Sequence, residues 1–254
     1  MFSVEERDSV RDHVLELAAS DDRVIAGAVV GGLADGGGDR WSDLDLTFGV
    51  AESVPVAEVL ADWTVDLVRS FDAMHLFDLP SDAAIYRVFL LPGCLQVDLS
   101  FAPALDFGAR GPKFRLLFGK AVERPHIPQP SPHDLFGLAV HHAVRARFCI
   151  ERGRSWQAEH WIVGVRENAL SLACRRRGLD ARHGRGFDDL PAEVLDALEG
   201  ALVRSMKRSD LLRALDAAVA ALLRETTEVA DVAARVEPQL RELTSTALSD
   251  SRRT

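Results

Sequence analysis

Residues 29–46 have the sequence VVGGLADGGGDRWSDLDL and join a glycine-rich loop to two aspartates. The apolar run from Val24 to Val30 is typical of a buried strand, and glycines after a strand leave backbone N–H groups open to an anion. After the loop, Asp43 and Asp45 alternate with leucines. Because strand side chains alternate between two faces, both aspartates are predicted to emerge on one face while the leucines enter the core.

The pair Asp43 and Asp45 is a candidate metal site. Two carboxylates held side by side disfavour each other's ionised form unless a cation lies between them. Oxygen ligands favour a hard ion such as Mg²⁺, which binds through one or two carboxylates together with substrate phosphates. The stretch therefore indicates a metal and a phosphate in one site, the alternative being two acids on a solvated strand end.

A second strand with the same alternation is predicted at residues 94–101, CLQVDLSF. Apolar residues alternate there with polar ones, and Asp98 lies on the polar face. If this strand lies beside the first in one sheet, its polar face brings Asp98 to Asp43 and Asp45. The sequence therefore offers three carboxylates for one metal site.

The glycine loop, the D-x-D pair and the later Asp98 together resemble the nucleotidyltransferase superfamily of DNA polymerase β, especially its small antibiotic nucleotidyltransferase branch. The interval from Gly31 to Asp43 suits that pattern, as does Ser42 directly before the first aspartate. The resemblance covers about residues 20–120. It implies an α+β fold, with a polymerase β-like nucleotidyltransferase domain built on a mixed sheet and followed by an all-α helical-bundle domain.

The resemblance also implies an enzyme that moves a nucleoside monophosphate, expected to be AMP from ATP, to a hydroxyl of a small molecule. An aminoglycoside-like antibiotic is the acceptor class that it suggests, which would make the chain an antibiotic resistance protein. The residues expected to bind Mg²⁺ and to carry catalysis are Asp43, Asp45 and Asp98. Those expected to bind the nucleotide are Gly31, Gly32, Arg40 and Ser42.

The loop departs from the family pattern at two positions. The family usually has a serine after the first glycine, where this chain has Gly32, which keeps the N–H and lacks the hydroxyl. Several relatives carry a basic residue where this chain has Asp35, and Arg40 is expected to supply the missing positive charge. These departures leave open a non-catalytic nucleotide sensor. A toxin–antitoxin type nucleotidyltransferase that modifies a protein partner is a second alternative.

Composition limits the kinds of partner that the chain is expected to bind. The net charge of −9 argues against a protein that binds long nucleic acid, because such binding depends on a basic surface. There is no run of about 18 apolar residues, and the N-terminus is acidic where a signal peptide would be basic. We therefore expect no membrane association and a cytoplasmic protein. The three cysteines, Cys94, Cys149 and Cys174, lack metal-ligand spacing and are expected to be buried thiols. Nothing in the sequence indicates an oligomeric state.

The predicted organisation is a catalytic domain at residues 1–124, a proline-rich linker at 125–133 and a helical acceptor-binding domain at 134–254. The linker contains prolines that disfavour a regular helix. In the first domain, helices are predicted from a capping box at residues 3–6 to about 19 and from 55 to about 71, and residues 91–94 are predicted to form a hairpin turn. The helices predicted in the last domain span about 134–152, 155–177, 191–205 and 209–247, the last broken before Pro238.

The acceptor-binding candidates lie on the first two helices of the last domain. His141 shares a polar stripe with Asp134 and Arg145, whereas His142 falls on the apolar stripe and is interpreted as a hydrogen-bonded core histidine. The second helix, for which Ser155 is the candidate N-cap, carries Glu159 and Arg166 on one stripe about 10 Å apart. His141, Glu159 and Arg166 are therefore expected to contact the acceptor. The alternatives are plain solvent exposure for the histidine and interdomain salt bridges for the other two residues.

Overall fold

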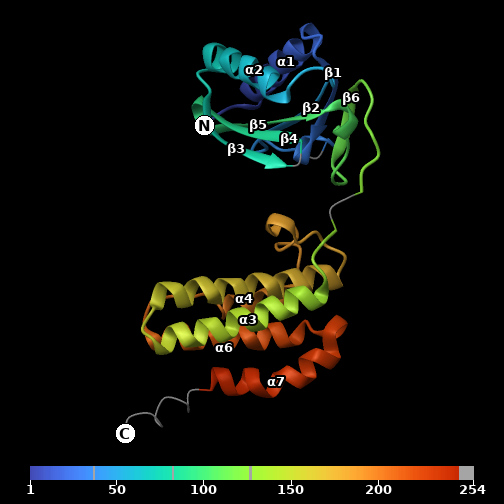
Figure 1. The fold of residues 1–254 in the computed structure, drawn as a ribbon. Coiled ribbons are helices and arrows are strands. Elements are labelled where there is room, and N and C mark those ends of the chain that lie inside the picture. Colours follow the sequence, from blue (N-terminus) through green and yellow to red (C-terminus); the bar gives the residue numbers. More distant parts are fainter. Residues whose placement is uncertain (37, 82, 126–127, 246–254) are drawn as a thin grey trace. The chain divides into compact units, whose positions relative to one another are not determined.

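The computed structural model describes residues 1–36, 38–81, 83–125 and 128–245. Contacts between Cα atoms divide the chain into two compact units, Met1–Ile127 and Pro128–Thr254. The first unit is built on a sheet and the second on helices (Figure 1). This confirms the predicted α+β composition, with a sheet followed by a helical part.

The sheet of the first unit has six strands in the order β3-β4-β5-β2-β1-β6. Strands β2 and β5 are parallel, while every other neighbouring pair is antiparallel, so the sheet is mixed as predicted. The strands are β1 Val24–Val30, β2 Leu44–Val50, β3 Met74–Ser81, β4 Ala84–Leu91, β5 Leu95–Pro103 and β6 Phe114–Phe118. The edge strands β3 and β6 were not predicted from the sequence.

Helices α1 Val4–Ser20 and α2 Val56–Phe71 cover one face of this sheet (Figure 1). Helix α1 begins with the predicted capping box, in which the Ser3 hydroxyl and the Glu6 carboxylate each accept the other residue's backbone N–H. The core beneath the helices includes the rings of Phe48, Trp63 and Phe101, whose centroids are 5.0 to 5.3 Å apart. This aromatic cluster fastens the two central strands, β2 and β5, to α2.

The hairpin turn predicted at residues 91–94 joins β4 to β5, and Leu91 pairs with Leu95. Gly93 and Cys94 both adopt positive φ angles in this turn. The Cys94 side chain therefore lies at the surface before the buried alternation of β5 begins, and the prediction of a buried thiol is wrong at this position. Cys149 and Cys174 are buried as predicted.

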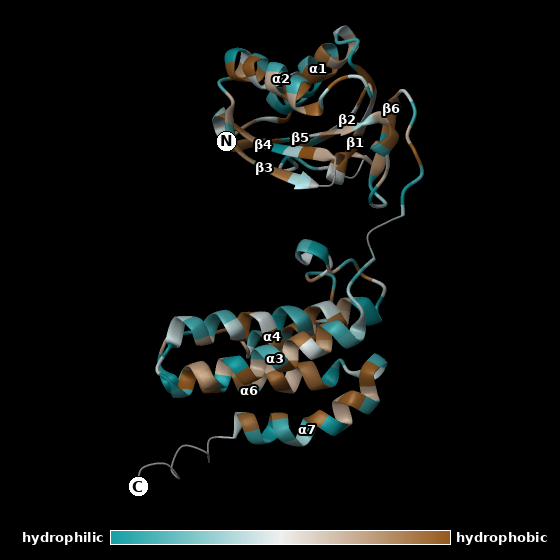
Figure 2. Ribbon diagram, in the orientation of Figure 1, coloured by the Kyte–Doolittle hydropathy of each residue, from teal (hydrophilic) through white to brown (hydrophobic). Residues whose placement is uncertain are grey.

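The second unit consists of helices, and no strand occurs in its described part, residues 128–245. The helices are α3 Pro132–Glu151, α4 Ser155–Arg176, α5 Ala192–Glu199, α6 Arg208–Arg224 and α7 Ala230–Thr244. Their colours alternate between apolar and polar along α4, α6 and α7 (Figure 2), as expected for helices that share one apolar core. Among the described helices, none combines the length and the apolar character that a membrane span requires.

The first helix of this unit begins earlier than predicted, whereas the second begins at the predicted residue but lacks the predicted cap. Helix α3 begins at Pro132 inside the predicted linker, because a proline fits the first turn of a helix, where its missing N–H has no partner to lose. Ser131 caps this helix by accepting the N–H of Asp134. Helix α4 begins at Ser155 itself, with Arg154 in the N-cap position and no side-chain cap.

The later helices end differently as well. Helix α5 stops at Glu199 instead of 205, because the backbone N–H groups of Arg204 and Ser205 turn to the Asp210 carboxylate at 2.7 Å. The predicted helix at 209–247 breaks after Arg224, and the break before Pro238 was wrong, since this proline lies inside α7. At the break, buried Glu225 accepts a hydrogen bond from Arg177 at 3.0 Å. Residues 246 and 247 of the predicted helix lie outside the described residues.

Candidate metal and nucleotide site

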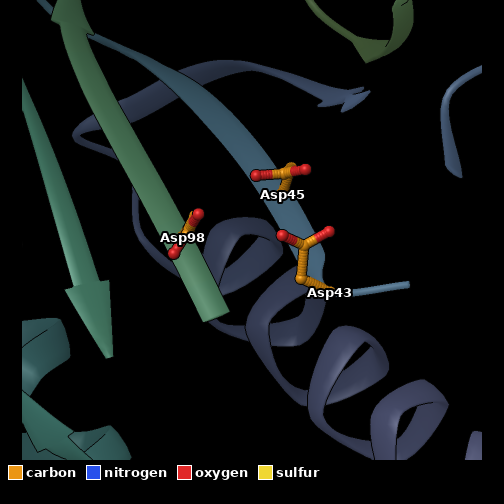
Figure 3. A group of neighbouring side chains, drawn as sticks. All are labelled: Asp43, Asp45 and Asp98. Atoms are coloured by element: carbon orange, nitrogen blue, oxygen red, sulfur yellow. The ribbon is translucent and has the colours of Figure 1, made fainter. Parts of the chain in front are cut away.

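Three carboxylates meet on the sheet face opposite α1 and α2 (Figure 3). Asp45 and Asp98 are direct partners in the parallel register of β2 and β5, and Asp43 lies just before β2. One oxygen of each carboxylate lies within 4.8 Å of the others. The structure thus brings together the three aspartates that the alternation of the two strands placed on polar faces.

The geometry of this triad suits a divalent cation. Oxygen ligands about 2.1 Å from one Mg²⁺ lie at most about 4.2 Å apart, which is close to the separation of the three carboxylates. Without a cation, three carboxylates this close repel one another. The donor set consists of oxygen atoms alone, which favours Mg²⁺ or Mn²⁺ over a softer metal.

Asp98 is held by two neighbours. Its side chain is buried, with the residue 3% exposed. The Tyr86 hydroxyl on β4 donates to Oδ2, and Gln96 Nε2 donates to both carboxylate oxygens at 3.0 and 3.2 Å. Burial raises the pKa of Tyr86 far above its usual value, and the hydrogen bond to Asp98 raises it further, so the phenol remains a donor. A buried and doubly supported carboxylate differs from an acid on a solvated strand end.

The sequence indicated only one of these two neighbours. Gln96 shares the polar face of its strand with Asp98, so the alternation of residues 94–101 contained a signal for it. Tyr86 reaches the site through the pairing of β4 with β5, in which it lies opposite Ser100. That pairing is a long-range contact, and the single tyrosine had no local pattern that marked it.

Gly31 lies against the triad. Its φ angle is +69°, and a Cβ atom at this position would lie 2.2 Å from Asp45 Oδ2. Only glycine therefore lets the loop pass so close to this carboxylate in this conformation. The next residue, Gly32, has an ordinary φ, and its nearest neighbour for an added Cβ is Ser42 Oγ at 3.6 Å.

These two glycines form a matched pair for mutation. We expect Gly31→Ala to lower the free energy of unfolding by at least about 1–2 kcal/mol, the cost of a left-handed residue with a Cβ, and to weaken Mn²⁺ binding by displacing Asp45. Gly32→Ala should leave both quantities close to the wild type, because space exists and its N–H is kept. Denaturant unfolding and calorimetric Mn²⁺ titration would measure both effects. Equal behaviour of the two variants would contradict the close contact of Gly31 with Asp45.

Arginine side chains from two distant elements hold the loop between β1 and β2 in place. Arg7 on α1, which is 5% exposed, donates to the backbone carbonyls of Asp39 at 2.7 Å and Ser42 at 3.1 Å. Arg115 on β6 donates to the carbonyl of Ala34 at 3.1 Å. These charge-assisted bonds hold both ends of the loop, including the residue directly before Asp43. The sequence offered no signal for either arginine.

The other predicted nucleotide-binding residues have partners within the loop. The Arg40 guanidinium lies 4.0 Å from the centre of the Trp41 ring, and both residues are exposed. The Ser42 hydroxyl accepts the backbone N–H of Asp39 at 2.9 Å, which closes the turn before Asp43. Asp35 forms an ion pair at 3.7 Å with Lys113 from the segment before β6. The positive charge beside Asp35 therefore comes from Lys113. Contact of Arg40 with a nucleotide stays a prediction.

The acceptor-binding candidates lie in the second unit. His141 is exposed on α3, with its ring 5.9 Å from that of Trp161 on α4, while Glu159 and Arg166 are half-buried. The Arg166 guanidinium donates to the carbonyl of Ala201 at 3.4 Å within the same unit. His142 is half-buried instead of fully in the core. Its ring lies against Gly164, and burial lowers its pKa.

Comparison with known proteins gives matches only among solved structures. No family model matches the sequence, and no curated protein matches it significantly. The solved structures that match include two nucleotidyltransferases. An aminoglycoside 6-adenyltransferase from Bacillus subtilis has 14% identity and a TM-score of 0.41, covering 92% of this chain and 96% of its own. MenT4, a nucleotidyltransferase toxin from Mycobacterium tuberculosis H37Rv, has 16% identity and a TM-score of 0.23, covering 93% and 90%.

Proposed function

We propose that the chain is a metal-dependent nucleotidyltransferase that moves a nucleoside monophosphate, AMP from ATP as the first candidate, to a hydroxyl of a small molecule. The observation that carries the proposal is the pairing of Asp45 with buried Asp98 in adjacent parallel strands, with Asp43 beside them. An oxygen-only site of this kind suits the metal-assisted displacement at a phosphate. A cytoplasmic location is part of this proposal, because ATP is available there.

Each side chain of the site has a place in this reaction. Asp43, Asp45 and Asp98 would hold Mg²⁺, which when bound supplies positive charge to the triphosphate during in-line displacement. The acceptor oxygen forms a bond to the α-phosphorus, the bond from that phosphorus to the bridging oxygen breaks, and pyrophosphate leaves. Asp98, which Tyr86 and Gln96 hold in position, takes up the proton of the acceptor hydroxyl. The backbone N–H groups of Gly31 and Gly32 are proposed to face the outer phosphates.

The metal requirement is the first test. We expect an excess of EDTA to abolish pyrophosphate release, Mg²⁺ or Mn²⁺ to restore it, and a zinc-selective chelator to have no effect, because the ligands are carboxylate oxygens. The assay follows pyrophosphate from ATP in the presence of hydroxyl-bearing acceptors. Full turnover in excess EDTA would contradict the proposed role of the triad.

The acceptor is proposed to be an aminoglycoside-like antibiotic bound with help from the second unit, through His141, Glu159 and Arg166. A screen of labelled ATP, GTP, CTP and UTP against a panel of antibiotics, followed by mass analysis of the acceptor, would identify both substrates. Transfer of label to a co-purified protein would instead indicate the toxin–antitoxin type of enzyme. Nucleotide binding without any transfer would indicate a sensor.

A further inference from the structure

Strand β3, at one edge of the sheet, is exposed along nearly its whole length. It is the first strand in the sheet order, so among the described strands it pairs with β4 alone. All residues from Met74 to Pro80 are exposed. An edge strand offers unpaired backbone groups to another strand, and proteins usually cover or charge such an edge. Four residues of this edge are instead large and apolar, with exposed fractions between 44% and 63%: Met74, Leu76, Phe77 and Leu79.

The opposite edge of the sheet differs. Strand β6 has five residues, three of which are half-buried, and Leu116 is its one exposed apolar residue. Arg115 on this strand already donates to the loop between β1 and β2. The long, apolar and exposed strand is therefore a property of the β3 edge and not of the sheet as a whole.

The exposed segment is complementary to itself in an antiparallel arrangement. Residues 74–79 have the sequence MHLFDL, in which the order of apolar and charged residues is the same from either end. A second copy of the strand, related by a two-fold axis between positions 76 and 77, would place Met74 opposite Leu79 of the second copy. The same axis would place His75 opposite Asp78. Apolar residues would thus meet apolar residues, and the imidazole would meet a carboxylate.

A β-bulge makes this arrangement compatible with the two faces of the sheet. In a regular strand, positions 74 and 79 would lie on opposite faces, because they are an odd number of residues apart. The register between β3 and β4 shifts by one residue in the middle of the segment. Met74 therefore pairs with Leu90 and Leu79 with Tyr86, both on the face that carries the triad. The bulge thus brings the two apolar ends of the segment to one face.

The two charged residues of the segment share the other face. His75 pairs with Phe89 and Asp78 with Arg87, whose guanidinium donates to the Asp78 carboxylate at 2.7 Å. The His75 ring also lies 3.0 Å from Asp78 within one chain. Pairing about the two-fold axis would bring the imidazole of each copy to the carboxylate of the other, with no like charges directly opposite. Pro80, which cannot donate a backbone hydrogen bond, ends the segment.

We propose that the β3 edge binds a second copy of this chain, through antiparallel pairing of residues 74–79 about a two-fold axis. The sheets of the two copies would form one continuous sheet, in which the same surface serves both partners. Backbone hydrogen bonds between the two edge strands supply affinity, and the matched side chains fix the register. The self-complementary order of residues favours a second copy over an unrelated strand. Association of two copies needs no substrate and is independent of the proposed nucleotidyl transfer.

The oligomeric state of the full chain is the first test. We expect sedimentation velocity to show a dimer that dissociates on dilution. Leu79→Lys places a charge within the paired segment and should weaken dimerisation at least about tenfold. Leu116→Lys makes the same change at an exposed position of the opposite edge, so it should leave dimerisation as in the wild type. Circular dichroism would check that both variants fold.

A pair of cysteines tests the register. In the proposed pairing, the Cα atoms of position 74 in one copy and position 79 in the other lie about 4.5–5.5 Å apart, within reach of a disulfide. Within one chain, the same positions lie roughly 15 Å apart along the strand, which is too far for a disulfide. We therefore expect Met74→Cys/Leu79→Cys to form a covalent dimer on oxidation and neither single variant to do so. Cys94→Ser in all three removes the native exposed thiol.

The possible outcomes either support or overturn the paired edge. A wild-type dimer that Leu79→Lys alone weakens, together with a covalent dimer of the double cysteine variant alone, supports it. A wild-type chain that stays monomeric at every concentration overturns it, as does a dimer on which the two lysine variants have the same effect. If Leu79→Lys does not fold, the cysteine pair decides. Absence of the covalent dimer, or equal cross-linking of a single variant, overturns the proposed pairing.

Discussion

Asp43→Asn and Asp45→Asn are each expected to lower kcat for nucleotidyl transfer by at least about 10³-fold, because a metal ion contributes several kcal/mol of transition-state stabilisation. Each substitution replaces an anionic oxygen ligand with a neutral amide. The two residues lie within 4.8 Å of Asp98, so the loss of either leaves an incomplete site. The effect should fall on turnover and on metal affinity together.

The same substitutions should leave the fold intact. Each removes one of three carboxylates that oppose one another when no cation is bound, and neither aspartate is fully buried. Pyrophosphate release measures the activity, and thermal unfolding without metal measures the stability. Asp12→Asn, an exposed residue on α1, is the control for the loss of one negative charge. Near-normal turnover in either triad variant would mean that these residues are only a solvated strand end.

Asp98→Asn and Glu159→Gln are expected to affect different kinetic constants. Asp98 is the proposed proton acceptor, so Asp98→Asn should lower kcat by at least about 10²-fold, the lower range for a positioned base. Glu159 lies half-buried on α4 in the helical unit and is proposed to hold the acceptor. Glu159→Gln should therefore mainly raise the KM for the acceptor, which is the result of lost ground-state binding.

Steady-state kinetics with the acceptor varied would distinguish these roles. In the Asp98→Asn variant, the asparagine oxygen can accept hydrogen bonds from both Tyr86 and Gln96. We therefore expect this variant to fold, and denaturant unfolding would check it. A collapsed kcat for Glu159→Gln beside a nearly normal Asp98→Asn would reverse the assignment of the base.

The sequence predicted the triad because the pattern behind it is local. The two-residue period of a strand is enough to place Asp43 with Asp45, and Asp98 on the polar face of its own strand. The turn at residues 91–94 was equally visible, since Pro92 and Gly93 favour it. Whether the two strands were neighbours was not visible, because strand pairing depends on the whole sheet. The parallel register that sets Asp98 opposite Asp45 came from the tertiary structure.

Helix ends likewise depend partly on local sequence, which the prediction captured, and partly on tertiary contacts, which it missed. The capping box at Ser3 and Glu6 acts within four residues and was predicted correctly. The break after Arg224 was missed, because buried Glu225 accepts a hydrogen bond from Arg177, which lies at the end of α4, far away in the sequence. Pro238 misled the prediction, since it lies inside α7 despite the hydrogen bond it cannot donate; the proline is exposed, while Ala233 and Leu240 of the same helix are buried.

By itself, the sequence determined the elements whose cause lies within a few residues: the glycine loop, the two alternating strands, the first helices and the carboxylates available for a metal. Tertiary structure decided which distant groups complete the site. Arg7 and Arg115 anchor the loop, and Tyr86 supports Asp98. The physical reason is that a buried arginine or tyrosine acquires its partner only when separate elements pack, and no period along the chain records that contact.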